Sequence, residues 1–207
     1  MKLFYSPGAC SLSPHIVLHE AGYEFVTERV DLKGHVTASG APLASVHAKN
    51  YVPILELDDG SRLTEGPVIV QYLADQKPAA DLIAKSGTTQ RYRTQEWLNF
   101  ITSELHKSFR PLFRRDTTSK DWQAEAESSV AQRFDWLNGE MGGRPHLMGE
   151  RFSVADAYLF TVLNWTGYVG IDLGRWPVLS AYSDRIAQRP KVQQTLRAEG
   201  LPVKAAA

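Results

Sequence analysis

The sequence is short of cysteine and carries no excess charge. Cys10 is the one cysteine among 207 residues, so the chain cannot form an internal disulfide, and a reducing compartment suits it. Acidic and basic residues balance at 23 each, which removes the attraction that draws basic proteins to nucleic acid or anionic membranes. No apolar run approaches the roughly 20 residues that span a bilayer, and the N-terminal "MKLFYSPGAC" has no signal-peptide core. We therefore expect a cytoplasmic protein that binds neither nucleic acid nor membrane.

The first third of the chain has a hydrophobic period that changes several times. Strand, helix and strand patterns are followed, after an irregular stretch, by strand, strand and helix. The Asp59-Gly60 pair is typical of a tight hairpin turn. This order predicts a small α/β layer with a mixed sheet. The predicted elements are a strand at Lys2–Ser6, a helix at Leu12–Gly22, a strand at Glu24–Leu32, a hairpin at Pro53–Glu65 and a helix at Pro67–Gln76.

The remaining two thirds show no convincing strand. The pattern breaks near 77–89, which indicates a linker, and helical periodicity dominates beyond it. We expect a first domain over residues 1–78, a linker over 79–88 and an all-helical bundle over 89–207. The predicted helices lie at 91–113, 122–137, 152–165 and 177–190.

The longest predicted helix, 91–113, carries two stripes at helical spacing. The apolar stripe, which predicts a face packed in a core, consists of Leu98, Ile101, Leu105, Phe109 and Leu112. The polar stripe consists of Asn99, Ser103, His106 and Arg110. At about 100° per residue the two stripes lie well over 90° apart. Pro111 is expected to kink or end the helix.

The segment 152–165 is apolar nearly all the way round, which predicts a helix at the centre of the bundle. Its start, from Ser153 to Asp156, fits a capping box with aspartate in place of the usual glutamate or glutamine. We interpret both residues as folding residues without a part in chemistry.

Cys10 lies where the first strand gives way to the first helix. Backbone N–H groups and the helix dipole at such a junction favour a thiolate, although free cysteines are often simply small buried residues. Ser13 stands where a dithiol oxidoreductase would carry a second cysteine. A mixed disulfide at Cys10 therefore needs an external thiol for its release. The nearby His15 and His19 are expected to be helix-surface residues.

Several motifs in order resemble those of the glutathione transferases, and most closely those of the bacterial beta class. They are "MKLFYSPGACSLSPHIVLHEAG", "VPILELDDGSRLTEG", "VIVQYLAD", "EWLNFITSELHK", "FSVADAYLF" and "RIAQRPKVQ". The resemblance implies a thioredoxin-like N-terminal domain, an all-helical C-terminal domain and a cytosolic homodimer. It also implies that glutathione is the co-substrate, and we expect no metal.

The resemblance further implies a set of glutathione-binding residues. Val52-Pro53 matches the family's cis-proline step, whose backbone pairs with the cysteinyl unit of glutathione. Glu65 and Gly66 match the pair that holds the γ-glutamyl end. Two positions depart from the common pattern, since Tyr51 replaces a glutamine and His35 replaces a lysine that would meet the glycyl carboxylate. On the helical side the implied residues are His106 and Lys107, which face glutathione, and Asn99 and Ser103, which reach the partner subunit's glutathione.

The implied catalytic residues are Cys10, His106, Tyr5 and Ser11. Cys10 ranks first because beta-class enzymes form a mixed disulfide with glutathione, while Tyr5 and Ser11 each offer a hydroxyl for the same sulfur. The electrophile is expected to meet Ala9, Arg110, Phe113 and Trp165.

The predicted function is transfer of the glutathione thiolate to hydrophobic electrophiles. One alternative is a glutathione-dependent thiol reductase or reductive dehalogenase that works through a mixed disulfide at Cys10. A second alternative is a carrier of hydrophobic ligands without catalytic activity.

Overall fold

The computed structural model describes residues 1–203, and its internal contacts divide the chain into two compact units. The first unit joins Met1–Ile83 to the described residues from Ala187 onward, and the second is Ala84–Ile186. The boundary near residue 83 falls inside the expected linker. The last helix, however, belongs by its contacts to the first unit, whereas the expected second domain ran to residue 207. Residues 204–207 of that expected domain lie outside the described residues.

The first unit is built on a five-stranded sheet in the order β3-β2-β1-β4-β5. β1 pairs in parallel with β2 and antiparallel with β4, and β5 extends the sheet antiparallel to β4. This is the mixed, thioredoxin-like arrangement that we expected. The strands are β1 (Lys2–Tyr5), β2 (Val26–Asp31), β3 (Val36–Thr37), β4 (Ile54–Glu56) and β5 (Arg62–Thr64).

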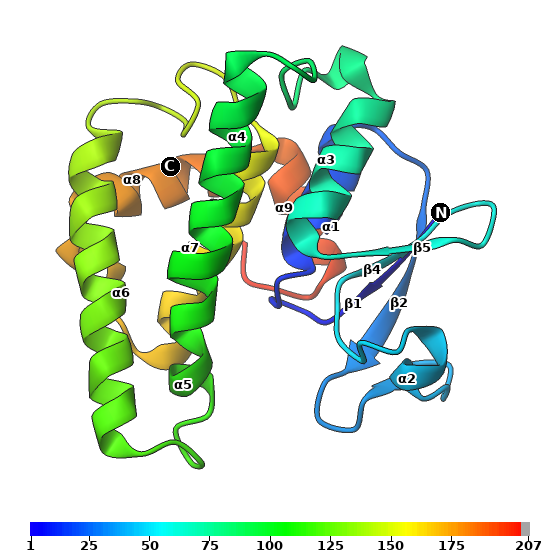
Figure 1. Cartoon of the computed structure of the whole chain (residues 1–207), viewed down its shortest axis with the longest axis horizontal. Coiled ribbons are helices and arrows are strands. Elements are labelled where there is room, and N and C mark those ends of the chain that lie inside the picture. The colour runs from blue at the N-terminus through cyan, green and yellow to red at the C-terminus, as the bar shows by residue number, and fades with distance from the viewer. Residues whose placement is uncertain (204–207) are drawn as a thin grey trace. The chain divides into compact units, whose positions relative to one another are not determined.

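Helices complete the first unit, and α1 packs against both α3 and α9 (Figure 1). Fully buried side chains at Leu3, Ile16 and Ile54 form part of its core. The short β3 and α2 lie in the stretch that looked irregular in sequence. The helices are α1 (Leu12–Glu20), α2 (Leu43–Val46), α3 (Gly66–Gln76), the 3₁₀ turn η1 (Pro78–Ala80) and α9 (Pro190–Ala198).

The second unit is helical throughout its regular elements. The helix expected at 91–113 is present as a continuous series, and its apolar stripe is buried as predicted. Pro111 does not end it, because this proline lies in the first turn of α5, where no backbone N–H is needed. The elements are α4 (Thr89–Phe100), the π-helical turn η2 (Ile101–Leu105), the 3₁₀ turn η3 (His106–Phe109), α5 (Arg110–Phe113), α6 (Lys120–Met141), α7 (Val154–Val169), the 3₁₀ turn η4 (Leu173–Arg175) and α8 (Pro177–Ala187), which reaches the unit boundary.

α7 is buried along nearly its whole length, as its apolar composition predicted. The capping box is confirmed, since the backbone N–H and the hydroxyl of Ser153 each donate to Oδ2 of Asp156 at 2.8 Å. Asp156 is fully buried and also accepts from the backbone N–H of Leu147 and the hydroxyl of Tyr182, both at 2.8 Å. Four donors thus satisfy one buried carboxylate. Within the described part of the chain, no helix has both the length and the apolarity to cross a membrane.

α9 is fastened to α1 by polar contacts within the first unit. Arg189 forms a two-pronged ion pair with Glu20, with N···O distances of 2.7 and 2.9 Å. Nδ1 of His19 lies 2.8 Å from the hydroxyl oxygen of Thr195. Because Thr195 donates its one hydroxyl proton to the carbonyl of Lys191, Nδ1 of His19 must carry a proton and act as the donor.

The packing of α9 over α1 generates a prediction about acid stability. Burial, helped by the nearby His15 and Lys191, lowers the pKa of His19 from 6.5 to about 4. Between these two values the unfolded chain takes up a proton that the folded chain refuses, so stability falls as pH falls. His19 is only half-buried, and after allowance for solvent screening we expect it to remove about 1.5 kcal/mol of unfolding free energy between pH 7 and 4.

The measurement is urea unfolding at a series of pH values for the wild type and His19→Gln, which keeps a donor for Thr195. The variant should lose less stability on acidification than the wild type. The same substitution at His146, in the second unit, is the matched control, and any change that it shares with His19→Gln is not assigned to His19. An identical pH dependence for wild type and His19→Gln would rule out this role.

Candidate functional site

Cys10 lies on a turn between β1 and α1, as the sequence predicted. The turn is closed by backbone hydrogen bonds from the N–H of Ala9 to the carbonyl of Ser6 at 3.0 Å and from Leu12 to Ala9 at 2.9 Å. Cys10 is partly exposed, and its Sγ donates to the carbonyl of Val52 at 3.3 Å. The fold therefore brings the thiol to the Val52-Pro53 step, although 42 positions separate the two in sequence.

The turn that carries Cys10 is anchored by a buried carboxylate. Gly8 has φ +70°, in the left-handed region that favours glycine, and its N–H donates to Oε2 of Glu199 at 2.9 Å. The other oxygen of Glu199 lies 2.8 Å from Nδ1 of His15. His15 is only 1% exposed and His19 is half-buried, so the expectation of helix-surface histidines was wrong. The reason is that α9 covers this face of α1, and sequence analysis had missed both α9 and Glu199.

The two hydroxyl candidates near Cys10 differ in environment. Ser11 is fully buried, and its Oγ donates to the carbonyl of Ser6 at 3.2 Å and accepts from the N–H of Ser6 at 3.1 Å. Tyr5 is 8% exposed at the end of β1. Burial raises the pKa of Tyr5, the negative charge of Glu199 raises it further, and Arg29 partly offsets this. Tyr5 therefore remains a neutral phenol at neutral pH.

The Val52-Pro53 peptide bond is cis, as the resemblance implied. Gly66, the first residue of α3, lies beside it, since a Cβ on Gly66 would come 3.9 Å from Cγ of Pro53. A helix N-terminus presents backbone N–H groups and suits an anion. Pro67 removes one of these groups, which leaves the N–H of Gly66 as the donor at the start of the helix.

Glu65 precedes α3 in an unusual conformation. Its φ of +67° is uncommon for a residue with a side chain and costs of order 1–3 kcal/mol. Oε1 of Glu65 accepts from Nζ of Lys49 at 2.7 Å and from the hydroxyl of Tyr51 in a short hydrogen bond. The hydrogen bond between Lys49 and Glu65 raises the pKa of Lys49. The pKa of Tyr51 is raised first by burial and then by its own bond to Glu65. Tyr51 thus contacts the very carboxylate that the resemblance assigns to the γ-glutamyl end.

His35 lies at the exposed edge of the same region. Its Nδ1 is 3.2 Å from the carbonyl of Asn50, the residue before Tyr51. The first unit therefore brings Cys10 to Val52, Pro53 to Gly66 and Tyr51 to Glu65, although the sequence scatters these residues over positions 10–66. Among the described residues, no group of three or more histidine, cysteine, aspartate or glutamate side chains is arranged to hold a metal ion.

In the second unit, His106 is held by aromatic side chains of α7. Its Nδ1 lies 2.7 Å from the hydroxyl of Tyr158, and its ring meets the ring of Trp165 edge-on at 4.6 Å between centroids. Trp165 also packs edge-on against Phe113 at 5.5 Å. Trp165 is 3% exposed and Phe113 is 48% exposed. Two implied electrophile-binding residues, Phe113 and Trp165, thus contact each other, and Trp165 contacts His106. The sequence had not singled out Tyr158.

The other implied residues are more open. Asn99, Ser103, Lys107 and Arg110 are all exposed, and the hydroxyl of Ser103 donates to the carbonyl of Asn99 at 3.1 Å. Ala9, in the first unit, is partly buried against the hydrophobic cluster that contains Val52.

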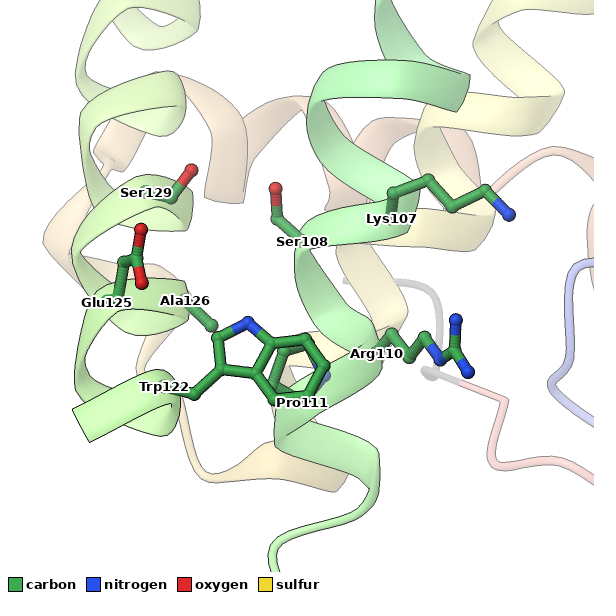
Figure 2. Close-up of a pocket in the computed structure, with 8 residues that line it drawn as sticks. All are labelled: Lys107, Ser108, Arg110, Pro111, Trp122, Glu125, Ala126 and Ser129. Atoms are coloured by element: carbon green, nitrogen blue, oxygen red, sulfur yellow. The ribbon is translucent and has the colours of Figure 1, made fainter. Parts of the chain in front are cut away.

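A pocket of about 340 Å³ lies in the second unit between α6 and the segment of η3 and α5. Figure 2 shows Lys107 and Arg110 extending away from α6, while Ser108 faces it. The side of the pocket formed by α6 carries Trp122, which sequence analysis did not connect with any site. Its lining residues are Lys107, Ser108, Arg110, Pro111, Trp122, Glu125, Ala126 and Ser129.

Comparisons with known proteins identify the family of this chain. Residues 8–76 match the glutathione S-transferase N-terminal domain and residues 100–190 match the C-terminal domain. Glutathione S-transferase GstA of Escherichia coli O157:H7 is 45% identical, over 97% of this chain and 100% of that protein. A sphingomonad glutathione S-transferase solved in complex with glutathione is 48% identical, with a TM-score of 0.93 over 98% of this chain and 100% of that one.

A bacterial beta class glutathione S-transferase from Sphingomonas chungbukensis is 46% identical, with a TM-score of 0.94 over 98% of this chain and 100% of that one. The expected fold, a thioredoxin-like domain followed by a helical domain, is thereby confirmed. With identity of this level over nearly its whole length, the chain belongs to the glutathione S-transferase family and stands close to its beta-class structures.

Proposed function

We propose that this chain conjugates the thiolate of glutathione to hydrophobic electrophiles. The observation that carries the proposal lies within the first unit, where Cys10 contacts Val52 and where Pro53 lies beside Gly66 at the start of α3. A thiol, the backbone of the Val52-Pro53 step and a carboxylate at a helix start are the groups that a γ-glutamyl tripeptide with a central cysteine requires.

Each part of glutathione has a complementary group. The backbone of Val52 pairs with the cysteinyl unit, as an added strand would. The carboxylate of Glu65 receives the γ-glutamyl ammonium, and the N–H of Gly66 receives the adjacent carboxylate. His35 meets the glycyl carboxylate.

The helical residues complete the proposal on the strength of the family resemblance. His106 and Lys107 act on glutathione, and Asn99 and Ser103 reach the glutathione of the partner subunit. The electrophile meets Ala9, Arg110, Phe113 and Trp165, and the aromatic packing of Trp165 on Phe113 supports an apolar pocket for it. Catalysis then comes from a lowered thiol pKa in glutathione and from proximity to the electrophile.

The three residues offered for the glutathione sulfur take different parts. Ser11 uses its hydroxyl on Ser6, so we assign it to holding the Cys10 turn. Tyr5 is a neutral phenol, and burial raises its pKa further, so it retains a proton to donate. Cys10 is partly exposed and is the residue that can form a mixed disulfide with glutathione.

The partly exposed thiol of Cys10 favours a second activity, the reduction of glutathione mixed disulfides. The Cys10 thiolate attacks the glutathione sulfur, the other thiol leaves as thiolate, and a second glutathione thiolate then releases oxidised glutathione and regenerates Cys10. Ser13 cannot act as a resolving thiol, so the second glutathione is required.

Substitution of Cys10 separates the two activities. We expect Cys10→Ser to abolish reduction of a glutathione mixed disulfide and to leave conjugation of a simple aryl halide within about tenfold of the wild type. Cys10→Ala, which has no hydroxyl to replace the thiol, is the matched comparison. Steady-state rates with both substrates measure the effect. Loss of conjugation in both variants would show that Cys10, and not a hydroxyl donor, supports the glutathione thiolate.

Tyr51 gives a test of the γ-glutamyl site. Tyr51→Phe removes the hydrogen bond to Glu65, so the carboxylate is held less firmly and the KM for glutathione should rise about three- to tenfold with kcat within twofold. The effect should vanish for a glutathione analogue that lacks the α-amino group. Tyr92→Phe, a change at an exposed tyrosine of the second unit, is the control. An unchanged KM in Tyr51→Phe would remove this tyrosine from the site.

We further propose a homodimer. Trp97, Phe100 and Trp136 form an aromatic cluster with centroid distances of 5.0 to 6.0 Å, and Trp136 is 50% exposed. Exposed aromatic rings are enriched at protein interfaces.

Light scattering at micromolar concentration should give twice the 23.1 kDa mass of the chain. Trp136→Glu should shift the mass toward the monomer, because it places a charge in an apolar contact. Trp122→Glu is a matched control, since Trp122 is equally exposed and lies in the same helix. A monomeric wild type would refute the dimer, and equal behaviour of the two variants would remove Trp136 from its interface.

A further inference from the structure

We propose that Tyr158 is a positioning residue that sets the proton arrangement of His106. Its hydroxyl donates to Nδ1 of His106, so the ring proton resides on Nε2 and the imidazole presents an N–H donor on that side. The inference rests on the proposed function, in which His106 acts on glutathione. A donor at Nε2 is what an imidazole needs to stabilise a thiolate or another anion.

The first support is the hydrogen bond itself. The distance of 2.7 Å between the Tyr158 oxygen and Nδ1 of His106 is that of a well-formed bond. A neutral imidazole has one acceptor nitrogen and one donor nitrogen. A phenol is the stronger donor and an imidazole nitrogen the stronger acceptor, so the proton of the bond belongs to Tyr158.

The second support is the rigidity of Tyr158. It is 2% exposed in the second turn of α7, between residues that are fully buried. The start of α7 is fixed by the bonds of Ser153 to Asp156. Trp165 stands seven positions after Tyr158 and so on the same face of the helix, and its ring contacts the His106 ring. One buried face of α7 therefore holds the imidazole at two points.

The third support is the backbone around His106, which is not a regular α-helix. The π-helical turn Ile101–Leu105 ends where the 3₁₀ turn His106–Phe109 begins. The hydroxyls of Thr102 and Ser108 bond to carbonyls four residues earlier, an arrangement that often bends helices. Such single π turns often mark functional sites. Because the helix around His106 is irregular, the direction of its ring depends on its own contacts, and these come from Tyr158 and Trp165 of α7.

The test is Tyr158→Phe, which removes one oxygen and keeps the ring. In the wild type, ¹⁵N NMR of the His106 ring should show the proton on Nε2. In the variant the two nitrogen shifts should move toward each other, as both tautomers become populated. kcat/KM for glutathione conjugation should fall about tenfold. In a His106→Asn background, Tyr158→Phe should change kcat/KM by less than twofold, because the group it positions is gone.

Tyr182→Phe is the matched control. Tyr182 is also a fully buried tyrosine, but its hydroxyl donates to Asp156 and not to His106. It should lower stability while leaving the His106 nitrogen shifts and kcat/KM as in the wild type. If Tyr158→Phe leaves both the shifts and kcat/KM unchanged, or acts equally with and without His106, the proposal is overturned. The tautomer of His106 is measured by NMR and does not depend on turnover. A wild type that conjugates nothing would therefore refute the proposed function, while the NMR result would still test the role of Tyr158.

Discussion

The buried carboxylate of Glu199 is the contact on which the thiol turn depends. One of its oxygens accepts the N–H of Gly8 and the other meets His15, with the Glu199 side chain fully shielded from solvent. A buried hydrogen bond to a charged group contributes about 1.5–3 kcal/mol, so the bond from Gly8 to Glu199 stabilises this conformation of the turn. Glu199 lies 191 positions from Gly8 in sequence, and it is the packing of α9 on α1 that makes the C-terminal helix part of the first unit. His19 with Thr195 and Arg189 with Glu20 keep α9 in the register that this contact requires.

Glu65 is a second constraint, and it combines backbone with charge. Its left-handed backbone is unfavourable for a residue with a side chain, yet it places the carboxylate just before the first N–H of α3. Lys49 and Tyr51 both donate to the same oxygen, Oε1. A negative group and a helix start thus lie side by side, which is the pattern that complements the ammonium and carboxylate of one amino acid. A glutamine at position 51 would offer an amide, whereas Tyr51 reaches the carboxylate with a rigid ring.

Local patterns predicted those parts of the fold whose cause is local. β1, α1, the hairpin of β4 and β5, and the buried α7 follow from period, turn residues and a capping box, each of which acts within a few positions. The helix predicted at 177–190 ends at Pro190, whereas in the structure this proline begins α9, so the sequence pattern did not predict α9. The burial of His15 could not be predicted without α9, since only a distant segment covers it. Cys10 was found from its junction, but Glu65, Gly66 and Val52-Pro53 were assigned by resemblance, because nothing local indicates that the fold gathers them.

The helix that carries His106 has the burial pattern that the sequence predicted, although its backbone is not a regular α-helix throughout. Counting at 100° per residue assigned Asn99, Ser103 and His106 to one polar stripe, and all three avoid full burial. The π turn between Ile101 and Leu105 changes that angle, because it fits more residues into a turn than an α-helix does. The following 3₁₀ turn has fewer residues per turn and partly compensates, so Leu98, Leu105 and Phe109 remain on the buried side. Burial therefore survives the irregularity, while the direction of each polar side chain depends on its own contacts. For His106 those contacts come from α7, a helix whose sequence signalled only packing.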